Sequence, residues 1–325
     1  MKFLIPLIFC LGIYTPDCHS DPEWRSLTYD NDIFVGEDSG YTNGIYFSQY
    51  KTNQKSDKLT PGVLLNPLLW SLPEETHLEQ FSSTTIGQAI LTPFDITQET
   101  PDEGQLPYSG LLFMNQTFIV QNGSIADKVS TTLGVVGPWS GAESTQKFVH
   151  KMIGSDQPEG WDQQLDNELV FQFSRGRAWR NWHSKSNNMD FVSMAEVQLG
   201  TIESSINAGF LLRYGQEIEE TYAAGLLSPS RTTNPVAIEG GWYVYAGLHF
   251  AHLFNNIHAD GNTFSNSASI NYQRLQSGGF LGLAYSWQDF SITFAVNNIK
   301  VGIFSVDENI EDVLQYGSLT FLWRV

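Results

Sequence analysis

The chain has 325 residues, a net charge of −18 and only two cysteines. Charged residues make up 16% and aromatic residues 13% of the sequence, which is little charge and many rings for an ordinary secreted enzyme. The acidic balance argues against nucleic acid as a partner. After the N-terminus, no run approaches the roughly 18 consecutive apolar residues that a membrane helix requires, so the sequence excludes a helical membrane protein.

The N-terminus is typical of a signal peptide over residues 1–20. One lysine precedes the apolar run FLIPLIFCLGIY, and the short segment TPDCHS follows it. Cleavage leaves residues 21–325 as one exported domain. Because Cys10 and Cys18 both lie in the removed segment, we expect no disulfide and no cysteine-based metal site in the mature chain.

Segments of about ten residues that alternate apolar and polar side chains recur along the chain, separated by clusters of Gly, Asn, Asp and Pro. In chain order they are 26–33, 43–50, 81–91, 111–122, 128–137, 168–177, 191–203, 204–215, 242–254, 267–276, 278–289, 290–302 and 317–325. The last is the clearest, because one face would meet lipid and the other a polar lumen. Its two faces are Leu319, Phe321, Trp323 and Val325, against Ser318, Thr320, Leu322 and Arg324.

These segments predict an all-β protein. Backbone groups in hydrocarbon must pair among themselves, so strands at membrane depth must close into a ring. We therefore predict a closed antiparallel transmembrane β-barrel of about 12 strands in the outer membrane, with a short helix in an outer loop. The alternative is a soluble β-sandwich, because short alternating strands also build sandwiches.

Residues 139–156 predict that helix. Ser140 is placed to cap its first turn, Glu143 follows at the capping-box spacing, and Gly154 lies where the helix would end. Side chains four apart share a helix face, so Gln146 and His150 would project together. An apolar side is formed by Phe148, Val149, Met152 and Ile153.

The first predicted strand runs into a turn rich in hard oxygen ligands, which suit Ca²⁺. Asn31 and Asp32 would point to opposite faces of a regular strand, so they can serve one site only where the strand ends. The alternative is a solvated acidic hairpin loop. The polar residues of this turn are Asp30, Asn31, Asp32, Glu37, Asp38, Thr42 and Asn43.

The motifs NDIF, YTNG, LGVVGPWSGAESTQKFVHKMIG and GWDQQLDNE resemble the outer-membrane lipid A 3′-O-deacylases of the LpxR type. The motifs span residues 31–168, and the rest of the chain agrees in length and strand pattern. The resemblance implies a twelve-stranded barrel that removes the 3′-linked acyloxyacyl chain of lipid A with Ca²⁺. Its active site would lie between the barrel wall and a helix of an outer loop.

Carried across by motif, the resemblance assigns catalysis to His150, Asn31, Thr42 and Gln146, and calcium binding to Asp32, Asn31, Thr42 and Asp156. His150 would take a proton from water, and calcium would stabilise the oxyanion. Two features depart from the family pattern. Asp156 is a shorter carboxylate than the expected glutamate, and the stretch 90–110 has no Lys or Arg where the family carries a basic cluster.

The expected function is thus a monomeric, membrane-embedded ester hydrolase acting on lipid A or lipopolysaccharide. One alternative is an outer-membrane esterase or phospholipase that acts on another lipid. The missing basic cluster raises this possibility. A second is a passive pore or binding barrel. The joint occurrence of the Asn-Asp pair, the YTNG turn and a helix with Gln146 and His150 favours the enzyme.

Overall fold

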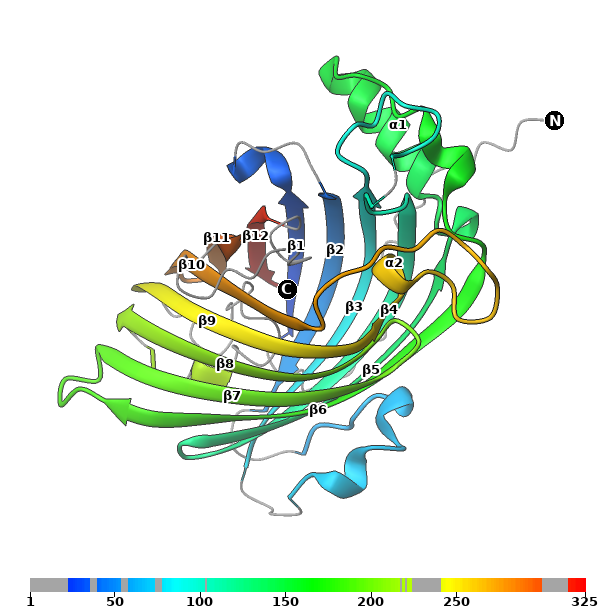
Figure 1. Ribbon diagram of the computed structural model, residues 1–325. Coiled ribbons are helices and arrows are strands. Elements are labelled where there is room, and N and C mark those ends of the chain that lie inside the picture. The colour runs from blue at the N-terminus through cyan, green and yellow to red at the C-terminus, as the bar shows by residue number, and fades with distance from the viewer. Residues whose placement is uncertain are drawn as a thin grey trace.

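The computed structural model describes residues 23–35, 40–53, 58–73, 78–102, 104–216, 218–219, 221–223, 241–299 and 315–325. The predicted signal peptide lies outside these residues. Each strand of the described chain pairs with its sequence neighbours, and β1 pairs with β12, so twelve antiparallel strands close a barrel (Figure 1). The barrel prediction is confirmed, and the β-sandwich is wrong.

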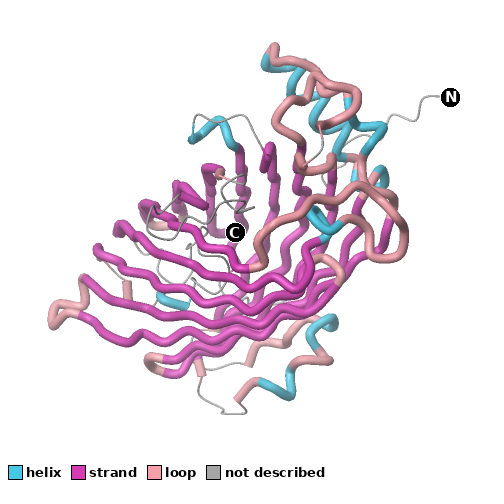
Figure 2. The backbone as a smooth tube through the Cα atoms, in the orientation of Figure 1, coloured by secondary structure: helices cyan, strands magenta, loops and turns pink. Residues whose placement is uncertain are grey.

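The strands are β1 (Glu23–Asn31), β2 (Gly40–Thr52), β3 (Glu79–Thr92), β4 (Ser109–Asn122), β5 (Ile125–Val136), β6 (Glu168–His183), β7 (Met189–Gly200), β8 (Glu203–Gly215), β9 (Gly241–Asn256), β10 (Leu275–Trp287), β11 (Phe290–Ile299) and β12 (Tyr316–Arg324). The helices are α1 (Ala142–Ile153) and α2 (Ile257–Asp260). The 3₁₀ turns are η1 (Asp32–Val35), η2 (Val63–Leu65), η3 (Leu69–Ser71), η4 (Pro138–Ser140) and η5 (Gly160–Gln163). The helices and 3₁₀ turns named here lie toward the two rims, while the wall consists of strands (Figure 2).

The strand predicted over 267–276 is wrong. This segment is mostly loop, and β10 begins only at Leu275. Its alternating side chains stabilise the loop: Tyr272 donates a hydrogen bond to Asp260 at 2.7 Å, and Arg274 forms an ion pair with Asp260 at 3.0 Å. Ile270 packs beside Tyr272 on a buried cluster, so alternation here reflects a packed loop rather than a pleated strand.

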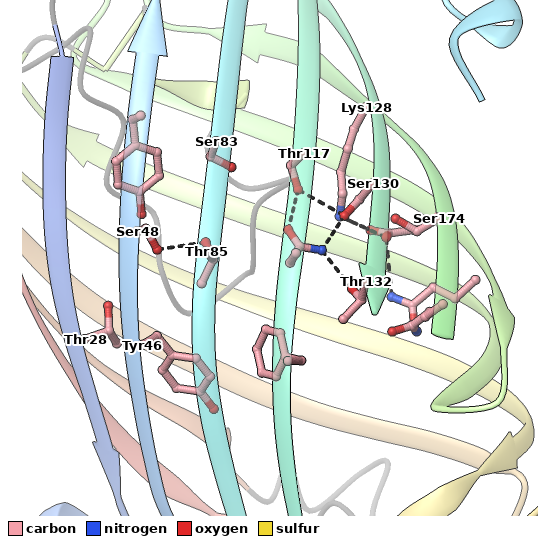
Figure 3. A pocket seen from close by; sticks show the side chains of 16 residues that line it. Thr28, Tyr46, Ser48, Ser83, Thr85, Thr117, Lys128, Ser130, Thr132 and Ser174 are labelled. Atoms are coloured by element: carbon pink, nitrogen blue, oxygen red, sulfur yellow. Dashed lines mark hydrogen bonds and ion pairs between the residues drawn. The ribbon is translucent and has the colours of Figure 1, made fainter. Parts of the chain in front are cut away.

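Alternation in β12 follows the prediction. Ser318, Thr320 and Leu322 are buried, whereas Phe321 on the other face is 48% exposed. The buried face lines the lumen, which holds a polar cavity of about 220 Å³. Hydroxyl groups and the Lys128–Glu196 ion pair at 2.9 Å line this cavity (Figure 3). The lumen is thus polar and the outer face apolar, as a membrane barrel requires.

Part of the connection that follows β8 packs into the lumen. Asp190 bonds to Arg180 at 2.7 Å and to Arg213 at 2.6 Å, and all three side chains are buried. Arg213 also donates to Thr221 at 2.5 Å, and Tyr222 is buried in the same cluster. These contacts fill lumen space that a simple pore would leave open.

The directions of the strands determine at which of the two rims each connection lies. β1, β3 and β5 end at one rim, where β2, β4 and β6 begin, so η1 and α1 share it (Figure 1). We call this the helix rim. β1 begins and β12 ends at the opposite rim. Within the described residues, no helix is long and apolar enough to cross a membrane.

Candidate active site

Helix α1 ends as predicted but begins differently. Gly154 has a left-handed backbone (φ 74°) and its N–H bonds to the carbonyl of His150, so the glycine terminates the helix. The N-cap residue is Gly141 and not Ser140, but the Ser140 hydroxyl still accepts from the N–H of Ala142 in the first turn at 3.4 Å while it donates to the carbonyl of Gly137 at 2.6 Å. Glu143 forms an ion pair with Lys147 one turn later.

The buried side of α1 is its polar side. Ala142, Gln146 and His150, each four residues apart, are 1%, 1% and 7% exposed. Phe148 and Met152 on the other side are 66% and 68% exposed. A surface helix normally turns its apolar stripe inward. Here the apolar side faces the surroundings, which suits a helix in contact with lipid.

The buried side lies on the outer face of the wall. A Cβ at Gly110 of β4 would overlap Ala142 and Ser140, so this glycine lets the helix approach the strand closely. Gln88 of β3 donates to the carbonyl of Ser140 at 2.7 Å. Gly110 shares its strand face with Leu112, which is 38% exposed, and this is the outer face of the barrel.

His150 is held in one tautomer. Its Nδ1 lies 2.6 Å from the backbone carbonyl oxygen of Asp156. A carbonyl only accepts hydrogen bonds, so Nδ1 carries the proton and Nε2 carries the lone pair. The ring is therefore prepared to accept a proton at Nε2. Asp156 contributes its main chain to this arrangement, and its side chain is exposed.

Trp161 fixes the orientation of Gln146. The indole Nε1–H donates to Oε1 of Gln146 at 2.7 Å, so the amide turns its Nε2 away from the ring. That Nε2 is buried and has no hydrogen-bond partner among the described residues. A buried donor without a partner indicates a missing acceptor. Trp161 was not assigned from the sequence, although it lies in the motif GWDQQLDNE.

The loops behind α1 support Trp161. Its ring packs on Tyr108 with centroids 5.0 Å apart, and Tyr108 donates to the carbonyl of Ile96 at 3.1 Å. Burial raises the pKa of Tyr108 to about 12, so the phenol remains a neutral donor. The main chain of Glu159 bonds to the same carbonyl at 2.9 Å. The two loops thus form a scaffold for the helix.

The turn after β1 begins where the prediction required the strand to end. Asn31 is the last strand residue, and its Oδ1 accepts from the N–H of Ile33 at 2.9 Å, which starts η1. Asp32 is the first residue of η1 and is 1% exposed. The ring of Phe34 packs against Phe294 at 5.9 Å, on the outer face of β11. Turn η1 therefore folds back over the outer wall.

One row of outward-facing residues links η1 to α1. Asn31 pairs with Asn43, Asn43 with Ile90, and Ile90 with Gly110, which contacts the helix. Three strand spacings span about 14 Å. The two regions thus share a rim and a face of four neighbouring strands. The structure describes nothing of the side chain of Thr42.

Asn43 is a further candidate that the sequence did not single out. Its side chain is 3% exposed, and its Oδ1 has no partner among the described residues. No group of three or more His, Cys, Asp or Glu side chains in the described chain could hold a metal ion. Calcium also takes amide and carbonyl oxygens, so Asp32, Asn31 and Asn43 offer a donor set that fits it.

A family model and one solved structure agree with this architecture. The family model described as outer membrane protein LpxR matches residues 4–325. Among solved structures, LpxR from Salmonella typhimurium is similar with a TM-score of 0.70 and 16% identity, covering 92% of this chain and 99% of that chain. The β-domain of the Bordetella autotransporter BrkA has a TM-score of 0.44 and 8% identity, covering 93% of this chain and 98% of that chain.

A porin, KdgM, solved with disordered oligogalacturonate, has a TM-score of 0.36 and 5% identity, covering 92% of this chain and 98% of that chain. No curated protein matches the chain. The family model covers nearly the whole sequence, and the twelve-stranded barrel agrees with it. The chain belongs to the LpxR family and is a β-barrel of the outer membrane.

Proposed function

We propose that the chain is a calcium-dependent lipid A 3′-O-deacylase that hydrolyses the ester of the 3′-acyloxyacyl chain. One observation carries this proposal. His150 and Gln146, on one side of α1, are buried against the outer wall of the barrel, while the opposite side of the helix is apolar and exposed. Polar reactive groups on the lipid-facing side of a barrel lower its stability, so their presence there indicates a function. They favour a substrate that arrives through the membrane.

The surroundings of α1 favour an amphipathic lipid. Trp139, Phe148 and Met152 are 66–68% exposed, and Leu169 at the start of β6 is 71% exposed. Acyl chains can lie against these side chains while the sugar headgroup stays at the rim. The scissile ester of lipid A lies at this boundary between apolar chains and polar headgroup, which suits a buried polar pair next to an exposed apolar surface.

His150 acts as the general base. Its Nε2 takes a proton from a water molecule as the water oxygen forms a bond to the acyl carbon. The ester C–O bond then breaks, and the imidazolium returns the proton to the departing sugar oxygen. The products are the fatty acid and the free alcohol. The carbonyl of Asp156 holds the ring orientation through both transfers.

Gln146 stabilises the negative charge on the acyl oxygen. Because Trp161 binds Oε1, the amide presents Nε2–H, and this buried donor has no other partner in the described chain. A donor that is fixed before the reaction needs no reorganisation when charge develops. We assign Trp161 as a positioning residue.

Calcium would be held by Asp32, Asn31 and Asn43, with Thr42 and Asp156 added by resemblance. When bound, it supplies a positive charge that polarises an ester carbonyl. The side chains of Asp32, Asn31 and Asn43 are buried at the helix rim and offer the carboxylate and amide oxygens that calcium takes as ligands. Asn31 also shapes the turn that positions Asp32.

An esterase that acts on another lipid is the second candidate. It is favoured by the stretch 90–110, which has no Lys or Arg to pair with an acidic headgroup. Asp95 in this stretch adds negative charge instead, and hydrogen bonds from Thr97 lower its pKa. Such a surface would need divalent cations to approach an anionic lipid.

Mass spectrometry of lipids from cells with and without the protein tests both candidates, with calcium and with a chelator. The proposal expects lipid A to lose one acyloxyacyl chain in the calcium arm alone. Lysophospholipid with intact lipid A would support the second candidate. Intact lipids in both arms, with the folded barrel present, would reject hydrolysis.

A further inference from the structure

The connection between β2 and β3 lies at the rim opposite α1 and, like the β8–β9 connection, is much longer than the tight turns of that rim. The β4–β5 and β10–β11 turns have two residues each, whereas residues 53–78 separate β2 from β3. Within this connection, residues 59–73 carry no charged side chain. Their sequence, LTPGVLLNPLLWSLP, forms the turns η2 and η3. Short turns of bacterial outer-membrane barrels face the periplasm, which assigns this rim to that side.

This segment lies on the outer wall, not in the lumen. Leu65 is fully buried against Phe118 and Val129. Their strand neighbours Thr117 and Ser130 line the lumen cavity, so Phe118 and Val129 face outward. The segment therefore covers the lower outer wall of β4 and β5, where a bare barrel would meet lipid (Figures 1 and 2).

The wall, together with the turns themselves, satisfies much of the segment's main chain. Gln116 accepts from the N–H of Leu64 at 3.1 Å, and Thr131 donates to the carbonyl of Leu64 at 2.9 Å. Arg175 donates to the carbonyl of Ser71 at 3.2 Å. Backbone groups without such partners would be costly in a membrane. The segment is thus suited to an environment poor in water.

Two large apolar side chains of the segment are not covered by other described residues. Val63 is 70% exposed and Trp70 is 84% exposed, and the indole N–H donates to the carbonyl of Pro67 at 2.9 Å. Next to the segment, Asp127 pairs with Arg177 at 2.9 Å on the outward face of β5 and β6. Such charges mark the polar boundary of the membrane, and tryptophan gathers at that boundary.

We propose that residues 59–73 form an anchor that inserts Val63 and Trp70 into the periplasmic leaflet of glycerophospholipids. The anchor is continuous with the membrane-facing wall on which it packs. Its uncharged surface and exposed tryptophan match the interface between acyl chains and headgroups. Arg177, 44% exposed on its side chain, lies where it can meet a lipid phosphate. The anchor holds the lower edge of the barrel at a fixed depth.

Nitroxide labels test this placement. Single cysteines replace Val63 or Trp70 in the full chain carrying Cys10→Ser and Cys18→Ser, refolded into vesicles of phosphatidylethanolamine and phosphatidylglycerol. Ser186→Cys in the β6–β7 turn of the same rim is the aqueous control, and Leu133→Cys on the outer wall is the lipid control. Heat-modified migration on gels confirms that each labelled barrel is folded.

We expect labels at both sites to collide with oxygen as the Leu133→Cys label does, and severalfold less with a water-soluble nickel chelate than the Ser186→Cys label does. Nickel accessibility equal to that of the Ser186→Cys control would overturn the anchor. Labels shielded from both oxygen and nickel would also overturn it, because protein rather than lipid would then cover the segment.

Discussion

Replacing Gly110 with alanine tests how α1 is seated. The added Cβ would lie more than 1 Å inside normal contact with Ala142 and Ser140, since carbon atoms in contact are about 3.5–4.0 Å apart. The helix must therefore retreat from β4 by about 1 Å or more. Misplacement of a catalytic group by about 1 Å can cost up to a hundredfold in rate. The barrel remains closed because the strand keeps its backbone pairing.

We expect Gly110→Ala to slow release of the acyl chain by about ten- to a hundredfold. The assay is the initial rate on purified lipid A in detergent, followed by mass spectrometry at saturating calcium. Gly123→Ala is the control for a glycine-to-alanine change away from α1: Gly123 lies in the turn at the opposite rim, where its φ of 56° makes alanine strained, but the added methyl group has no atom within 4 Å and does not reach the helix. Equal rates for the two variants would refute the seating of α1 on Gly110.

Three further predictions concern single groups. Trp161→Phe keeps a ring against Tyr108 but leaves Oε1 of Gln146 without its donor, so kcat should fall about tenfold with KM little changed; unchanged kcat would contradict the positioning role. Asp32→Asn should raise the calcium concentration for half-maximal rate severalfold, and an unaltered calcium titration would remove Asp32 from the site. Burial lowers the pKa of His258 to about 4, so up to about 3 kcal/mol of stability, present above pH 6.5, should be lost as the pH falls toward 4. The urea concentration at the midpoint of unfolding should therefore depend less on pH across this range in His258→Gln than in the wild type, and identical pH profiles for the two proteins would contradict this.

The strands could be predicted because lipid and lumen impose opposite chemistry on alternate side chains. In β12 this rule separates Ser318 and Thr320 from Phe321 without any knowledge of the neighbouring strands. It failed at 267–276, where Ile270 and Tyr272 alternate because they pack one side of a loop. Periodicity reports a two-sided environment, and a packed loop can supply one as well as a sheet can.

The helix could be predicted, but its orientation could not. Gly154 marks its end in the sequence because a left-handed residue is needed there. The inward side depends on what lies outside the barrel, and lipid reverses the usual rule by accepting Phe148 and Met152. The close approach of the helix to the wall depends on Gly110, which has no side chain and therefore gives no signal in the sequence.

Two of the proposed site residues could be recognised only in three dimensions. The sequence does not distinguish Trp161 from a tryptophan that only packs in the core, and its role rests on the 2.7 Å hydrogen bond to Gln146. Asn43 is one of several polar residues in an acidic turn, and only strand pairing shows that it lies beside Asn31. Such roles depend on which atom is left without a partner after folding.

The most direct test of the account is the rate of acyl release by His150→Ala, measured on purified lipid A with saturating calcium and a barrel shown to be folded. Removing the general base should lower the rate by about a hundredfold or more, with calcium binding retained. A variant that keeps most of the wild-type rate would contradict the central claim that this imidazole activates the water.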